Sequence, residues 1–232
     1  MLPGVAYHVT QRGVNHEQVF YCEQDRRTYL GLVQTQFKDS GARLLGWCLM
    51  TNHVHWVIVP DREDTLAVLF RRVHGRYAQY LNARRQRTGH LWQNRFFSCP
   101  IAEESLGTVL RYVELNPVRA EMVDAADRYL WSSASAHLKG PGHEVVALLD
   151  WTYWRDSGGH EEWHRLLGTV EELQKVQKLR RATYAGAPFG PAEFVRKLED
   201  RFGRQWLRPG RPKRVPMAVE KGTERSGAVS AA

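Results

Sequence analysis

The chain has 232 residues, which suffices for one domain of ordinary size with an appendage or for two small domains. Hydrophobic residues make up 43% of the sequence and aromatic residues 11%, so a packed core can form and wholesale disorder is excluded. The 33 Lys and Arg exceed the 25 Asp and Glu and give a net charge of +8. This favours a polyanionic partner, nucleic acid first, although solubility alone also explains a modest excess of charge.

Apolar residues recur at strand and helix spacings along the first half of the chain. In chain order the patterns predict a strand over Val5–Gln11, a helix over Asp25–Ser40, strands over Leu44–Met50 and His53–Pro60, a helix over Asp64–Arg84, a strand over Phe96–Ile101 and a helix over Glu103–Leu115. The order βαββαβα indicates an α+β fold, a ferredoxin-like sandwich with an antiparallel sheet. We expect helices on one face of this sheet, which leaves the other face available for a site.

The composition changes after His137. Charged helical stretches are expected over Glu162–Arg181 and Pro191–Phe202, and the chain from Arg204 onward is rich in Arg, Pro, Gly and Ser. The expected division is a first domain over residues 1–138, a helical C-terminal extension over 139–207, and a basic flexible tail over 208–232.

The cysteines and the apolar runs exclude several classes of protein. Cys22, Cys48 and Cys99 are widely spaced and form no C-x-x-C pair, so neither a disulfide framework nor a thiolate zinc site is expected. No signal peptide is visible, and the longest apolar run, Val54–Pro60, is too short to span a bilayer. We therefore expect a cytoplasmic protein without a membrane partner.

His53 and His55 form the sharpest local pattern. Residues i and i+2 of a strand point to the same face, so the two imidazoles can converge on one divalent ion. The alternative is a pair of core or surface histidines with ordinary hydrogen-bond partners.

Tyr112 and Asn116 are four residues apart and so share one helical face. A phenol and an amide on one face can address the same ion and the same phosphate, and the phenol can attack phosphorus as a nucleophile. The alternative is that Tyr112 packs against the sheet and Asn116 caps the helix.

Seven arginines lie between Arg71 and Arg95 without one Asp or Glu, and aromatic residues are interleaved with them. Guanidinium groups pair with phosphates and aromatic faces stack on unpaired bases, so this stretch favours nucleic-acid contact over a merely solvated helix face. A second basic cluster, Arg208–Arg214, suits either a minor-groove arm or a solubilising tail.

Six segments together resemble the REP-associated tyrosine transposases, relatives of the one-tyrosine HUH transposases of simple bacterial insertion sequences. They are Tyr7–Gly13, Trp47–His55, Tyr77–Tyr80, Thr88–Phe96, Tyr112–Ala120 and Trp131–Ser133. The resemblance covers roughly residues 1–140 and continues weakly to the sequence Gly-Arg-Pro-Lys at 210–213.

The resemblance implies a metal-dependent single-stranded DNA endonuclease and strand transferase that acts on hairpin-forming repeats through a 5′-phosphotyrosine. Tyr112 matches the catalytic tyrosine, His53 and His55 match the metal pair, and Asn116 matches the third-ligand position for Mg or Mn. The expected DNA-binding residues are Arg12, Arg71, Arg72, Arg76, Arg84, Arg85, Arg87, Trp92, Arg95 and Arg119. The expected partner is single-stranded DNA with hairpins, bound by a monomer or a homodimer.

Three other functions stay open at this point. A non-catalytic nucleic-acid-binding protein that retains the transposase fold would need the arginines but not Tyr112. A metal-dependent phosphodiesterase in which water attacks would cleave without a protein–DNA adduct. An RNA-binding role would show as a preference for ribose over deoxyribose.

Overall fold

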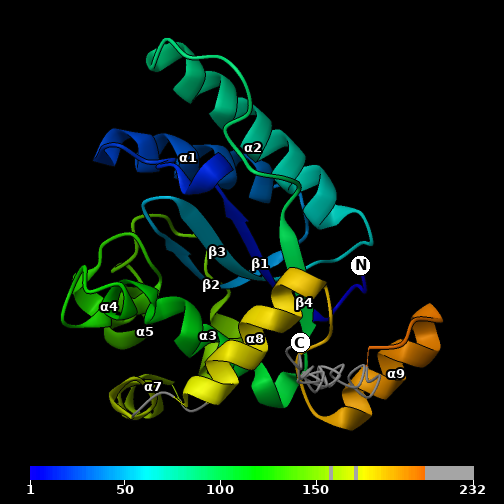
Figure 1. Cartoon of the computed structure of the whole chain (residues 1–232). Helices are drawn as coiled ribbons and strands as arrows, with labels where there is room; N and C mark the ends of the chain where they lie inside the picture. Colours follow the sequence, from blue (N-terminus) through cyan, green and yellow to red (C-terminus); the bar gives the residue numbers. More distant parts are fainter. Residues whose placement is uncertain (157–158, 170–171, 207–232) are drawn as a thin grey trace, which may run out of the picture.

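A four-stranded antiparallel sheet forms the centre of the computed structural model, which describes residues 1–156, 159–169 and 172–206 (Figure 1). Its strands are β1 (Ala6–Arg12), β2 (Arg43–Leu49), β3 (His53–Val59) and β4 (Phe97–Ile101). They lie in the order β2-β3-β1-β4, and every neighbouring pair is antiparallel. The sequence order β1-α1-β2-β3-α2-β4-α3 confirms the predicted ferredoxin-like sandwich.

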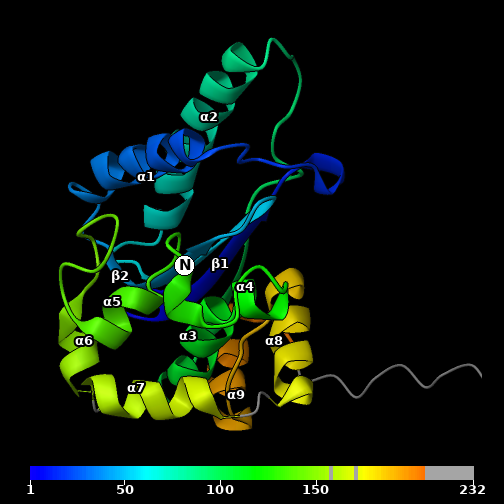
Figure 2. The same ribbon diagram turned by 90° about the vertical axis from the view of Figure 1, so that its left-hand side faces the viewer.

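Helices α1 (Glu23–Phe37) and α2 (Thr65–Arg84) cover one face of the sheet (Figure 2). Their buried aromatic rings meet strand β3, where the ring centroids of Tyr29 and Phe70 lie 6.1 and 6.3 Å from that of Trp56. Helix α1 begins where it does because the Asp25 carboxylate accepts the backbone N–H groups of Tyr21 and Cys22.

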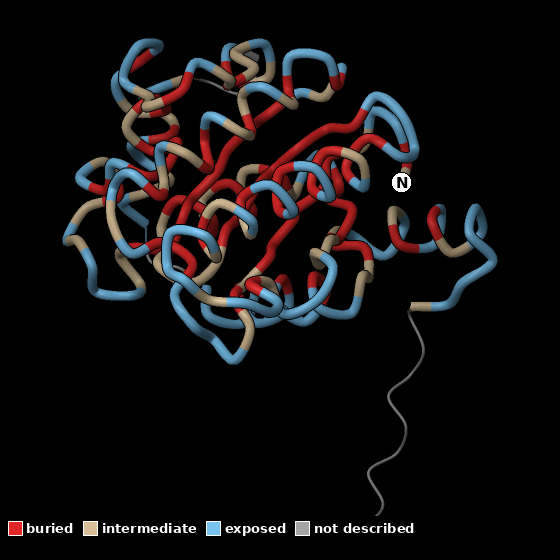
Figure 3. Tube along the Cα trace, turned by 90° about the horizontal axis from the view of Figure 1, so that it is seen from above, coloured by how far each residue is buried: buried red, intermediate tan, exposed pale blue. Residues whose placement is uncertain are grey.

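The opposite face is covered as well, so the expectation of one open face is wrong. Helices α3 (Leu106–Glu114) and α5 (Ala134–Lys139) lie there together with α8 (Leu173–Ala185), and Figure 3 shows the strands buried between the layers. The cause is the apolar stripe of α3, which has to be buried against the sheet. A Cβ at Gly46 in β2 would stand 2.5 Å from Leu110 Cδ2, so glycine permits this close approach.

A buried carboxylate ties α3 to the helices that follow it. Both side-chain oxygens of Glu114 are occupied: Ser133 and His137 donate to Oε1, and Trp163 Nε1 donates to Oε2 at 2.8 Å. The Ser133 hydroxyl also accepts the backbone N–H of Trp47 in β2. This network holds the helix two residues beyond Tyr112 in a fixed position on the sheet.

The remaining helices are α4 (Asn116–Arg119), α6 (Trp151–Asp156), α7 (Gly159–Gly168) and α9 (Ala192–Phe202). The stretch expected to be one helix over 162–181 instead contains the end of α7 and the start of α8, and α7 ends at Gly168, a poor helix former. The predicted basic tail over 208–232 lies outside the described residues. No helix in the part of the chain described is long and apolar enough to cross a membrane.

Candidate active site

Strand alternation places three histidines on the sheet face under α3. His53 and His55 come from β3, with ring centroids 4.8 Å apart, and His8 comes from the neighbouring strand β1. The rings of His8 and His55 are stacked, with centroids 5.1 Å apart and planes 11° apart. Sequence analysis singled out His53 and His55 but not His8, although His8 lies in the segment Tyr7–Gly13 that carries the family resemblance.

Tyr112 of α3 lies directly over this group. Its ring centroid is 5.7 Å from those of both His8 and His55, and it meets both rings edge-on. A cavity of about 310 Å³ opens here. Its walls are formed by Met50, His53, His55, Tyr112, Asn116, Arg119, Ala120, Arg180 and Tyr184. The structure therefore brings the four predicted catalytic and metal residues into one place.

A hydrogen-bond chain sets the tautomers of the two stacked histidines. Thr183 of α8 donates its hydroxyl proton to Leu179 O at 3.0 Å, so its oxygen accepts from His8 Nδ1 at 2.8 Å. His8 Nε2 then carries a lone pair and accepts from His55 Nδ1 at 2.9 Å. The chain leaves a lone pair on His55 Nε2, which is buried without a hydrogen-bond partner in the described structure.

His53 is oriented in the same sense by its neighbour in the turn. His53 Nδ1 lies 2.7 Å from Asn52 Oδ1, an acceptor, so the proton is on Nδ1 and the lone pair on Nε2. Burial lowers the pKa of His53 to about 4 and that of His8 to about 3, and burial also lowers the pKa of His55. All three rings are neutral at physiological pH, which is the form that binds metal ions.

These nitrogens fit a divalent metal ion. Among the side chains that the structure describes, no group of three or more His, Cys, Asp and Glu has the spacing of a metal site. Asn116 is the amide in the same cavity. Its Nδ2 donates to the backbone oxygens of Tyr112 and Val113 at 3.1 and 3.2 Å, which fixes the orientation of the amide.

Two guanidinium groups flank the phenol of Tyr112. The Arg119 carbon Cζ lies 4.5 Å from the ring centroid, and Arg119 also donates to the backbone oxygen of Tyr112. Arg180 Nε donates to the phenol oxygen at 3.3 Å. Arg180, Thr183 and Tyr184 all come from α8, and sequence reasoning missed them because a charged helix face carries no motif that distinguishes these positions.

Residues 2–116 match the family model described as "Transposase IS200 like". These residues belong to the IS200-like transposase family. The predicted relationship to this group of transposases is thereby confirmed for the part of the chain that carries the histidine pair and Tyr112. No curated protein gives a significant sequence match.

Two solved structures resemble this protein. A REP-associated tyrosine transposase bound to a REP hairpin matches with a TM-score of 0.52 and 15% identity, over 66% of this chain and 92% of that chain. A candidate transposase from Deinococcus radiodurans matches with a TM-score of 0.37 and 14% identity, over 49% of this chain and 92% of that chain. At such identities the first match shows a shared fold.

Most of the predicted DNA-binding arginines lie away from the Tyr112 cavity. Arg71, Arg72 and Arg76 are exposed on α2, which covers the opposite face of the sheet. Of the predicted set, Arg119 lines the cavity, and Arg12 stands beside it with its Cζ 5.4 Å from the Tyr184 ring centroid. Arg71, Arg72 and Arg76 thus lie on an exterior surface, and Arg119 is the member of this set that lines the cavity.

Other members of that set have protein partners. Arg84 forms an ion pair with the fully buried carboxylate of Asp25, and Arg87 pairs with Glu17 at 3.0 Å. Arg85 lies with its Cζ 4.0 Å from the ring centroid of Tyr21.

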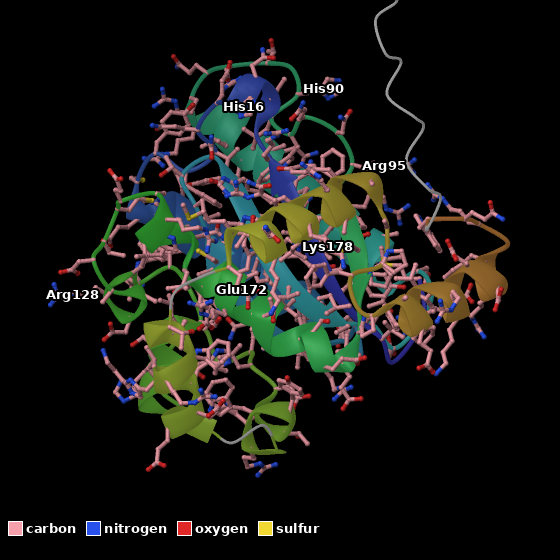
Figure 4. All side chains as sticks on the ribbon, turned by 60° about the horizontal axis from the view of Figure 1, so that its bottom comes forward. His16, His90, Arg95, Arg128, Glu172 and Lys178 are labelled. Carbon is pink, nitrogen blue, oxygen red and sulfur yellow. The ribbon has the colours of Figure 1, made fainter. Side chains whose placement is uncertain are left out.

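Trp92 belongs to the segment between α2 and β4. Backbone hydrogen bonds connect this segment to the end of β1 and the residues that follow it. The Trp92 indole is half-buried and donates to His74 O, while Val14 N donates to Leu91 O at 3.0 Å. Figure 4 shows His16 and His90 at this same end of the molecule. The aromatic residues of the arginine-rich stretch therefore face the core as much as the exterior.

Proposed function

We propose that this protein is a metal-dependent single-stranded DNA endonuclease and strand transferase that acts on hairpin-forming DNA with Tyr112 as its nucleophile. The observation that carries the proposal is the convergence of Tyr112, His53, His55 and Asn116 on one cavity, with an unpartnered lone pair on His55 Nε2. The family match supports DNA cleavage and joining in general. The REP hairpin in the structural relative supports hairpin DNA as the substrate class.

The chemistry is an in-line substitution at phosphorus. The Tyr112 phenol gives up its proton, its oxygen forms a bond to phosphorus, and the bond from phosphorus to the 3′ oxygen breaks. The leaving 3′ oxygen takes up a proton, so the products are a 5′-phosphotyrosine and a 3′-hydroxyl. Attack by another 3′-hydroxyl reverses these steps and joins strands without an external energy source.

The side chains around Tyr112 have definite parts in this step. Arg180 donates to the phenol oxygen and Arg119 lies on the ring, so both stabilise the negative charge that the attacking oxygen carries. A Mg or Mn ion held by His53, His55 and Asn116 would supply Lewis-acid polarisation of the scissile phosphate. The target phosphate has to enter a cavity of about 310 Å³, which favours a flexible single strand over a duplex.

The test uses single-stranded hairpin oligonucleotides taken from the DNA that flanks the protein's own gene, with Mg or Mn. Wild-type protein should form a covalent adduct on a denaturing gel, with the DNA mapped by peptide mass to Tyr112. Tyr112→Phe should bind the hairpin with unchanged affinity and form no adduct. Replacing both His53 and His55 with Ala should abolish metal-dependent cleavage while the fold survives.

Other outcomes distinguish the rival functions. Cleavage without any adduct would indicate attack by water, and binding without cleavage would indicate a non-catalytic binding protein. An adduct on a different residue, such as Tyr77, would refute the assignment of the nucleophile.

A further inference from the structure

A second cavity lies on the α2 side of the sheet, away from Tyr112. Its volume is about 630 Å³, which is within the range of ligand pockets, and it opens between the first half of α2 and the segment that leads into β4. Three aromatic side chains, Phe70, Trp92 and Phe96, form its walls. The ring centroids of Phe70 and Phe96 are 5.2 Å apart. A flat ring that enters this cavity would meet aromatic faces.

Gln11 of β1 contributes an amide to this cavity, and its side chain points to the face of the sheet away from the histidines. Gln11 is 2% exposed. Its Nε2 donates to the backbone oxygen of Asn94. This contact fixes which end of the amide is nitrogen, because in the flipped orientation Gln11 Oε1 would lie against the Asn94 oxygen and both atoms are acceptors. Gln11 Oε1 is left buried and without a hydrogen-bond partner in the described residues. An unsatisfied buried acceptor is costly and points to a ligand that donates an N–H group.

The charges around the cavity indicate which ligand that is. Arg71 and Arg95 are exposed residues that line it, and the sequence from Arg71 to Phe96 contains no Asp or Glu. One acid, Asp64, lines the cavity, and it lies 3.7 Å from Arg62 Nε. A planar aromatic ligand with an N–H donor, attached to negative charges that pair with the two arginines, is a nucleotide within a strand.

We propose that this cavity binds one unpaired base of the single-stranded DNA, with Gln11 Oε1 accepting from an N–H group on the edge of that base. The proposal rests on the proposed function, because it takes DNA as the substrate. Gln11 and Arg12 are neighbours on β1 whose side chains point to opposite faces, and Arg12 stands beside the Tyr112 cavity. The bound base is therefore separated by the sheet from the phosphate that reacts, and it serves recognition and not chemistry.

The experiment measures the affinity of the full chain, by fluorescence anisotropy, for a hairpin oligonucleotide with single-stranded flanks. Each flanking nucleotide is replaced in turn by an abasic site. In wild-type protein, abasic replacement at one position should weaken binding by about 5- to 150-fold, since stacking of one base contributes ~1–3 kcal/mol. At that position, an analogue of the base that lacks its N–H donor should bind about 2- to 10-fold more weakly than the natural base.

Two variants connect the effect to the cavity. Gln11→Leu should bind the natural base and the donor-free analogue equally well, whereas Gln79→Leu, a matched change at an exposed position of α2, should keep the wild-type difference. Phe96→Ala should reduce the effect of the abasic site. Thermal unfolding of each variant checks that it is folded, and Gln11→Leu alone is decisive if Phe96→Ala does not fold.

The outcomes separate this proposal from the proposed function. A flat abasic scan, or an unchanged donor effect in Gln11→Leu, overturns the base site while DNA cleavage by Tyr112 stands. Repeating the scan with Tyr112→Phe should give the same position, since no chemistry is required. Failure of the wild-type protein to bind any hairpin oligonucleotide overturns the proposed function and the base site together.

Discussion

Replacing Thr183 with Val tests whether α8 controls the proposed metal site from outside the segment that matches the family model. Thr183 is 1% exposed, and its hydroxyl accepts from His8 Nδ1 at 2.8 Å and donates to Leu179 O at 3.0 Å. Valine has almost the same shape, so the change removes a hydrogen bond without opening a cavity. It leaves the buried His8 Nδ1 without this hydrogen-bond partner, which we expect to lower the free energy of unfolding by about 1–3 kcal/mol.

The same change should weaken metal binding. Without the Thr183 acceptor, His8 is free to carry its proton on Nε2 and donate to His55 Nδ1. This moves the His55 proton onto Nε2, the nitrogen that has no hydrogen-bond partner in the described structure. Loss of such an outer hydrogen bond costs about 10- to 100-fold in metal affinity. We therefore expect the affinity for Mn²⁺ to fall by that factor in Thr183→Val and to stay near wild type in Thr183→Ser.

The assay is calorimetric titration of the intact protein with Mn²⁺, with urea unfolding in parallel. Thr35→Val is the matched control, because Thr35 also donates to the carbonyl four residues earlier, Gly31 O at 2.9 Å, but is exposed on α1. An unchanged Mn²⁺ affinity in a folded Thr183→Val protein would refute the argument that the chain through His8 sets the tautomer of His55.

Three further predictions address the surface, the core and pH. Changing Arg72 and Arg76 to Glu should weaken binding to all DNA sequences. It should also reduce the slope of log affinity against log salt by ~0.7 for each phosphate that the protein no longer neutralises. Filter binding at several salt concentrations measures both effects, and an unchanged slope would contradict DNA binding on α2. Glu114→Gln should lower the free energy of unfolding by about 1–3 kcal/mol, because one amide oxygen cannot accept from all three donors around it. In urea unfolding the control Glu104→Gln, a change at an exposed position, should have wild-type stability. Equal stability of Glu114→Gln and Glu104→Gln would refute the hydrogen-bond network around Glu114. Burial lowers the pKa of His74 to about 3, so the unfolded chain binds this proton first, and stability present above pH 6.5 is lost as the pH falls toward 3. His74→Phe should flatten that decline by up to ~1.4 kcal/mol per pH unit in urea unfolding at pH 7 and pH 5, and an identical pH slope would show that His74 is protonated in the native state.

The sequence by itself determined the elements and the local pairs of the site. Alternation along β3 placed His53 and His55 on the same face of the strand. Helical spacing placed Tyr112 and Asn116 on the same side of a helix. These rules act within about four residues, so they need no knowledge of the fold. They also predicted strand and helix bounds close to those observed, for example a helix over Asp64–Arg84 where α2 covers Thr65–Arg84.

Only the tertiary structure decided which groups distant in the sequence complete the site and which arginines form ion pairs within the protein. Thr183 meets His8 from the far end of the chain, and Arg180 meets Tyr112, because α8 packs across the strands (Figure 1). The stretch from Arg71 to Arg95 contains no Asp or Glu, but Arg84 forms an ion pair with the buried Asp25 of α1. Such pairs form when separate apolar faces are buried against each other, and that burial is set by the whole chain and by no local spacing.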